Sequence, residues 1–148
     1  MLTHLELRIR AATPDLPDAA PNLPARAAIA PDQEPLTVLC ATISDDALLE
    51  AVNAYCDTLR DAGLAYALLL LTVPARERTC VYWTPQLRLP VACGLNLDGD
   101  VVLDRADFHR LTRNPDPADS LQQLHEHLRA LDAFTPAAYP HTPTRTPA

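Results

Sequence analysis

The sequence predicts an α+β domain with a mixed, mainly antiparallel sheet of about five to six strands, one β-α-β unit and helices packed on one face. Three patterns support this fold class. Residues 3–10 alternate between apolar and polar side chains, residues 36–73 have the pattern strand, helix, strand, and residues 87–97 alternate again with high regularity. Alternation is typical of half-buried strands, and an apolar stripe every three or four residues is typical of amphipathic helices.

The N-terminal segments are expected to lie outside a compact core. Residues 3–10 have one polar face, which predicts a peripheral strand. Residues 11–35 contain six prolines and few large apolar side chains, which predicts a Pro-rich loop or arm. The predicted organisation is a peripheral strand over 1–10, the arm over 11–35, an α+β core over 36–133 and a disordered Pro- and Thr-rich tail over 134–148.

The core begins with the β-α-β unit. An apolar run ends at Ile43, Ser44 supplies a helix N-cap, and Gly63 suits the left-handed position after the helix. The helix has an apolar stripe formed by Leu48, Val52, Tyr55, Leu59 and Ala62. A nearly continuous apolar run over 64–73 then predicts a central strand parallel to the first.

The second half of the predicted sheet comes from residues 79–103. Pro90 marks the alternating stretch 87–97 as an edge strand or a bend, because proline cannot donate to a ladder. After a turn over 98–100, a short strand is expected to pair Leu97 with Val101 and Leu95 with Leu103.

Two helices follow, over 105–112 and 117–133. Asp116 is placed as the N-cap of the second helix. Leucines 121, 124, 128 and 131 lie on one face of that helix. The order of elements resembles that of small acidic dimeric secretion chaperones and related β-sheet interaction domains, although no family motif can be quoted.

The composition excludes several kinds of chemistry. The chain has no lysine, two serines and three glycines, which excludes Schiff-base lysines and glycine-rich phosphate loops. A formal net charge of -7 disfavours nucleic acid as a partner. The N-terminal residues lack a leader pattern and no apolar run is long enough to span a bilayer, so we expect a cytoplasmic protein with no membrane partner.

The sequence indicates no cofactor and no metal site. The four cysteines, Cys40, Cys56, Cys80 and Cys93, lack metal-ligand spacing and are expected to be inert core thiols. The acidic stretch from Asn96 to Asp107 resembles a calcium loop, but no register supplies both the glycine and the final ligand. A turn followed by a helix cap, with Leu103 packing on Phe108, explains the same residues.

Candidate site residues fall into two groups. His109 and Asp104 are the candidate catalytic residues, and Arg105, Arg110 and Arg113 beside them are candidates for binding an anionic ligand. Partner binding is predicted for aromatic and flanking side chains of the sheet, since exposed aromatic residues act as interface anchors. These residues are Tyr82, Trp83, Arg88 and Pro90.

The leading functional hypothesis is a non-enzymatic, homodimeric protein-interaction module that binds a partner through a sheet edge or face. The strand 87–97 is the predicted dimer contact, so Leu89→Arg is expected to break the dimer or unfold the domain. Two alternatives stay open: a small enzyme or ligand-binding domain with an Arg/His/Asp pocket, and an acidic inhibitor that mimics nucleic acid.

Overall fold

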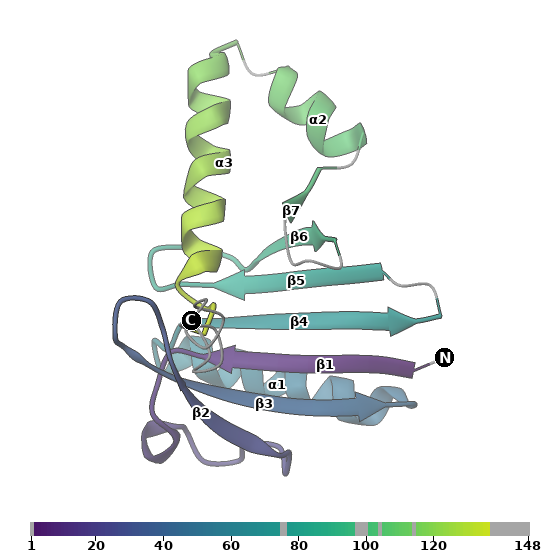
Figure 1. Cartoon of the computed structure of the whole chain (residues 1–148), viewed down its shortest axis with the longest axis vertical. Coiled ribbons are helices and arrows are strands. Elements are labelled where there is room, and N and C mark those ends of the chain that lie inside the picture. Colours follow the sequence, from purple (N-terminus) through teal and green to yellow (C-terminus); the bar gives the residue numbers. More distant parts are fainter. Residues whose placement is uncertain (1, 75–76, 97–100, 104, 114, 137–148) are drawn as a thin grey trace, which may run out of the picture.

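The computed structural model describes residues 2–74, 77–96, 101–103, 105–113 and 115–136. These residues form one antiparallel sheet with the strand order β2-β3-β1-β4-β5-β6-β7, together with three α-helices (Figure 1). The strands are β1 (Leu2–Ile9), β2 (Ala25–Ile29), β3 (Pro35–Ile43), β4 (Tyr66–Val73), β5 (Glu77–Trp83), β6 (Val91–Leu95) and β7 (Val101–Val102). The helices are α1 (Asp46–Asp61), α2 (Arg105–Thr112) and α3 (Pro117–Asp132). The predicted α+β class is confirmed; the sheet has seven strands, and all described neighbours are antiparallel.

β1 is a central strand rather than the peripheral strand expected from its alternation. It pairs with β3 along one edge and with β4 along the other. Leu5, Leu7 and Ile9 are buried in the core that includes α1, whereas Glu6 and Arg8 lie on the opposite face. Alternation shows that one face of a strand is polar, but it does not report whether both edges are paired.

The predicted strand–helix–strand unit is formed by β3, α1 and β4, with β1 inserted between the two strands. Because β1 is antiparallel to both, β3 and β4 run parallel to each other, as predicted. α1 is capped by Asp45, one residue after the predicted Ser44, through a 3.0 Å hydrogen bond from the backbone N–H of Ala47. Gly63 follows the helix with φ of 73°, the left-handed conformation that the sequence predicts there.

Helices cover both faces of the sheet, which corrects the prediction that they pack on one. α1 lies behind the sheet in Figure 1 and joins one core through Val52, Tyr55 and Leu59. On the opposite face, Leu131 and Phe134 at the C-terminal end of α3 pack in a second core. That core also contains Ala67, Cys80, Tyr82 and Leu95. Periodicity shows that a helix has an apolar face, but not which side of the sheet it meets.

The Pro-rich segment 11–35 is largely part of the domain. It contains a short 3₁₀ turn at Thr13–Asp15 and the strand β2, which pairs with β3 at the edge of the sheet. The buried hydroxyl of Thr37 donates to the Ala11 carbonyl at 2.8 Å and holds the start of the segment in place. The short strand has few large apolar residues, so its composition did not distinguish it from a loop.

The stretch 87–97 forms a shorter strand than its alternation predicts. β6 lies between β5 and β7, so it is not an edge strand, and Pro90 precedes it. Leu89 lies outside the strand and is 75% exposed. In the pairing of β6 with β7, Leu95 lies opposite Val101, where the predicted register has Leu97. Because side chains alternate along a strand, this shift of two residues leaves each side chain on its predicted face of the sheet. Leu97 and the predicted turn at 98–100 lie outside the described residues.

α2 and α3 extend from the β6–β7 side of the sheet and are called the helical arm below (Figure 1). Their bounds agree with the two predicted helices. Asp116 caps α3 as predicted, accepting from the backbone N–H of Ala118 at 3.0 Å. Within the described part of the chain, none of the helices combines the length and apolarity that a bilayer-spanning segment requires.

Candidate interaction surface

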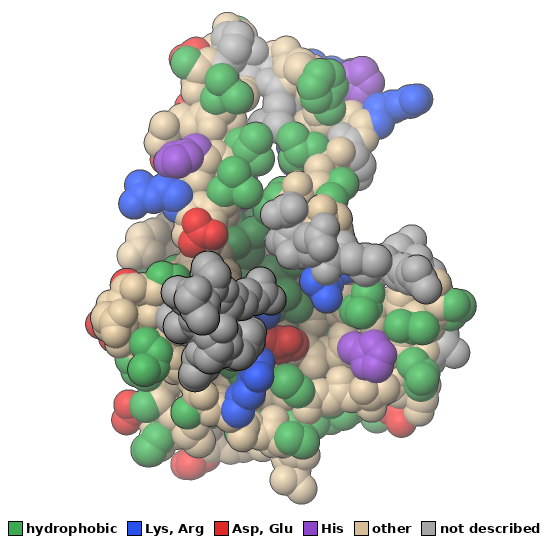
Figure 2. All heavy atoms as spheres, in the orientation of Figure 1, with side chains coloured by type: hydrophobic (Ala, Val, Ile, Leu, Met, Phe, Trp, Pro, Cys, Tyr) green, Lys and Arg blue, Asp and Glu red, His purple; other side chains and the backbone are tan. Residues whose placement is uncertain are grey.

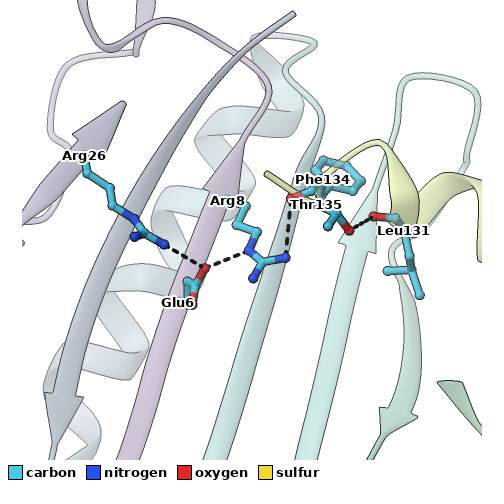
Figure 3. Close-up of polar contacts among 6 residues, drawn as sticks. All are labelled: Glu6, Arg8, Arg26, Leu131, Phe134 and Thr135. Atoms are coloured by element: carbon cyan, nitrogen blue, oxygen red, sulfur yellow. Dashed lines mark hydrogen bonds and ion pairs between the residues drawn. The ribbon is translucent and has the colours of Figure 1, made fainter. Parts of the chain in front are cut away.

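Three charged side chains form a cluster on the face of the sheet opposite α1 (Figure 3). Arg8 on β1 donates from Nε to Oε1 of Glu6 at 2.7 Å, and Nη2 of Arg26 on β2 lies 4.0 Å from the same oxygen. The cluster follows from the alternation of β1, because residues two apart on a strand share a face. Glu6 is therefore shared by two guanidinium groups.

This cluster borders a groove of about 370 Å³ along β1, β3 and β4. A second cavity of about 210 Å³ lies under the end of α3 and shares Arg8, Leu69 and Arg78 with the groove.

Burial raises the pKa of the Cys40 thiol, which also lines the groove, so this thiol stays protonated near neutral pH. Arg8 is engaged by internal contacts, an arrangement suited to holding the fold rather than to activating a substrate.

The same polar face anchors the C-terminal end of α3. Nη1 of Arg10 donates to the Ala133 carbonyl at 2.7 Å. Figure 3 shows the neighbouring contact, in which Nη1 of Arg8 donates to the Phe134 carbonyl at 3.4 Å. Carbonyls at a helix C-terminus lack intrahelical partners and carry partial negative charge, so arginines stabilise this end. The Tyr82 hydroxyl on β5 is hydrogen-bonded to Nδ1 of His127. These contacts fix the base of the arm on the sheet.

Beyond its base, the helical arm exposes large apolar side chains. Phe108 on α2 is 59% exposed, and Leu121 and Leu128 on α3 are 68% and 42% exposed. Figure 2 shows hydrophobic side chains gathered on the facing sides of the two helices. The predicted leucine stripe of α3 is therefore divided, because Leu124 and Leu131 are half-buried while its other two leucines are exposed. Clustered apolar surface of this kind is typical of interaction sites.

The two helices of the arm carry opposite formal charges. Residues 105–113 contain three arginines and one aspartate, which gives +2. Residues 116–132 contain four acidic residues and one arginine, which gives -3. The arm as a whole thus carries -1, and the rest of the chain carries -6 of the total of -7. The apolar surface therefore lies on a part of the protein where positive and negative side chains nearly cancel.

The residues predicted to form a catalytic or anion-binding pocket lie on α2 and just after it. Arg105, His109, Arg110 and Arg113 are exposed, and Asp104 lies outside the described residues. Arg110 is paired with Asp107 one helical turn away, at 2.8 Å. Ligand pockets are normally concave and bury most of the ligand. The exposure of these four side chains does not by itself provide such a pocket, and their role stays a prediction.

Two of the four predicted partner-binding residues are buried. Tyr82 and Trp83 point to opposite faces of β5, as their adjacency predicts, but they are only 1% and 8% exposed. Trp83 stacks on Tyr66 with ring centroids 6.4 Å apart and donates from its indole N–H to the Leu87 carbonyl at 3.1 Å. Arg88 is exposed and Pro90 is half-buried in the loop before β6. A partner could contact these two aromatic side chains only if the core residues that cover them moved away.

Sequence reasoning did not identify the exposed apolar residues of the arm. It assigned Phe108 to a staple with Leu103 and assigned the α3 leucines to a core-facing stripe, yet both staple residues are largely exposed. The available signal was the length of the α3 stripe. The stripe continues over about three turns, and only the C-terminal part of such a helix can lie over a sheet when its other end projects away.

The four cysteines are free thiols in the described structure. Burial raises the pKa of Cys56 on α1 to about 12, which keeps this thiol protonated. Cys80 on β5 lies directly opposite Cys93 on β6. Spacing along the chain did not reveal this pair because strand register brings the two residues together.

Within the described ranges, no group of three or more His, Cys, Asp and Glu side chains is placed to hold a metal ion. Asp98, Asp100 and Asp104 of the calcium-like pattern lie outside those ranges. No known protein family matches the chain, and comparison with curated proteins and with solved structures finds no similar protein. Function is therefore inferred from the geometry of the protein itself.

Proposed function

We propose that this protein is a non-enzymatic protein-interaction module that works as a homodimer, with the helical arm as the dimer surface. The observation that supports this proposal is the exposure of Phe108, Leu121 and Leu128 on α2 and α3, the two helices that project beyond the sheet (Figure 1). Removing apolar surface from water is the main favourable term in most protein association. A second copy of the arm would cover this surface.

The charges of the arm favour a second copy as the occupant. In a two-fold symmetric interface the same patch is used by both subunits, so α2 of one copy can lie against α3 of the other. This pairing places a helical segment with a formal charge of +2 against one with a formal charge of -3. Two helical hairpins joined in this way make a four-helix bundle, which encloses apolar faces that one hairpin leaves open.

This proposal retains the interaction-module hypothesis and moves its contact surface. The strand 87–97 was the predicted contact, but β6 has a strand on each side. The alternative of a pocket for an anionic ligand has four exposed side chains on α2 and just after it in its support, but their exposure does not by itself provide a concave site. The alternative of an acidic mimic of nucleic acid is supported by the net charge of -7.

Sedimentation equilibrium of the full chain at micromolar concentration tests the proposal. The wild type is expected to be a dimer, and Leu121→Arg is expected to be a monomer, because an arginine at this exposed position places charge in the apolar contact. Circular dichroism and thermal unfolding check that the variant is folded. We expect it to fold, because residue 121 is exposed and its substitution does not disturb the core.

Leu89→Arg provides the matched control. Leu89 is as exposed as Leu121, but it precedes Pro90, which lines a cavity together with residues of α1 away from the arm. This variant is expected to remain a dimer. A monomeric wild type, or equal dissociation by both substitutions, would rule out the arm as the dimer surface.

A further inference from the structure

β5 and β6 place two thiols in direct opposition. Cys80 and Cys93 are register partners, and their side chains belong to the core beneath the end of α3. Directly opposite residues in an antiparallel pair have Cα atoms about 4.5 to 5.5 Å apart. Disulfides span Cα separations of roughly 4.4 to 6.8 Å. The backbone of the pair is therefore already arranged for an S–S bond.

The other two cysteines cannot take part in the folded protein. Cys40, Glu6, Leu69 and Cys80 are successive register partners across four neighbouring strands. Three strand spacings of about 4.8 Å place Cys40 about 14 Å from Cys80, beyond the reach of a disulfide. Cys56 belongs to the core on the α1 side of the sheet.

A small reagent can approach this pair. Cys80 lines the 210 Å³ cavity under the end of α3, together with Arg8 and Arg78. Cys93 is half-buried, so its sulfur is more accessible than that of Cys80, which is 1% exposed. This difference in exposure makes Cys93 the attacking thiol, and the hydrogen bond that lowers the pKa of Cys93 acts in the same direction. Among the described residues, the lining of the cavity contains these two arginines and no carboxylate, since Glu6, the partner of Arg8, lies outside it, and this charge favours an anionic reagent.

We propose that Cys80 and Cys93 form a thiol–disulfide exchange site whose oxidant is an anionic low-molecular-weight disulfide such as oxidised glutathione. The Cys93 thiolate attacks one sulfur of the reagent, forms a mixed disulfide and releases one thiolate. That thiolate takes the proton of Cys80, and the Cys80 thiolate then attacks the Cys93 sulfur and releases the second thiolate. Two protein thiols are oxidised and one small disulfide is reduced to two thiols. This inference does not depend on the proposed function.

The test uses the reduced full-length protein and oxidised glutathione in mildly alkaline buffer, followed by alkylation and mass spectrometry. The expected product has two of its four cysteines protected from alkylation, retains no glutathione and yields a peptide in which Cys80 is linked to Cys93. Four alkylated thiols after prolonged incubation would overturn the proposal. So would a linked pair that forms only in denaturant.

Single substitutions separate the two steps. Cys80→Ser is expected to retain one glutathione on Cys93, because the resolving thiol is missing, and Cys80→Ala repeats the test if the serine variant unfolds. Cys40→Ser is the matched control and should form the Cys80–Cys93 link at the wild-type rate. Retention of glutathione on Cys93 in the wild type would show that Cys80 does not resolve the mixed disulfide.

Discussion

The core between the sheet and α1 and the helical arm use similar apolar residues in opposite ways. Leu7, Ile9 and Leu59 in this core have no measurable exposure, whereas Phe108 and Leu121 on the arm are more than half exposed. The core is closed by contacts within one chain. On the arm, similar side chains are left uncovered by the residues that the structure describes, so the comparison separates residues that fold the protein from residues available to a partner.

The largest expected effect lies in the closed core. Leu7→Ala should lower the free energy of unfolding by about 3 kcal/mol, because it removes buried methyl groups and leaves a cavity. Leu121→Ala should change it by no more than about 0.5 kcal/mol when measured on the monomer. Urea unfolding followed by circular dichroism measures both. Similar losses for the two variants would remove the distinction between the core and the arm.

A smaller effect is expected where the arm meets the sheet. Arg8→Ala should cost about 1 to 2 kcal/mol, because Glu6 and the Phe134 carbonyl both lose a charged donor. Arg26→Ala is the matched control. Its side chain is half exposed and lies as far as 4.0 Å from Glu6, which makes the ion pair weak. The free energy of unfolding is therefore expected to change by no more than about 0.5 kcal/mol. Equal costs at the two arginines would argue against an anchoring role for Arg8.

Tyr82→Phe should have a still smaller and more local effect. Loss of the hydroxyl removes the hydrogen bond to His127, at a cost of about 1 kcal/mol. Amide hydrogen exchange should accelerate around His127 in α3 and stay unchanged in β1 and α1. An acceleration spread evenly over the whole chain would indicate a general loss of stability instead of a loosened arm.

The smallest expected effect depends on pH. A hydrogen bond from Arg10 holds the pKa of Asp32 below its ordinary value of 3.8. The stabilisation by the ionised carboxylate is therefore complete above that value and is lost as the pH falls through the lower, folded-state pKa. The difference in Tm between wild type and Asp32→Asn should shrink as the pH is lowered below about 4. A difference that grows on acidification would contradict this assignment.

Local features of the fold could be predicted from the sequence. The bounds of α2 and α3, the caps at Asp116 and Gly63, and the parallel direction of β3 and β4 all follow from short-range patterns. Such patterns act within one or two turns of chain, where capping groups and apolar periodicity operate.

Long-range features could not be predicted in the same way. The insertion of β1 between β3 and β4, the pairing of β2 at the edge and the side of the sheet that receives α3 depend on contacts between distant segments. The candidate site illustrates the same limit. Phe108 and Leu121 have the spacing of core residues, and only the direction in which the arm leaves the sheet makes them a surface.

The way in which α3 is anchored leaves its outer sequence free to change. Arg8 and Arg10 hold carbonyl groups of the main chain at Phe134 and Ala133, and every residue type supplies a carbonyl. The other parts of the attachment are the packing of Ala130, Leu131 and Phe134 in the second core and the His127 contact, all in the C-terminal half of α3 or just after it. Substitutions at exposed positions in the first half of α3, such as Leu121, can therefore alter which surface the arm recognises while the domain beneath it stays intact, so that binding preference and folding can evolve separately.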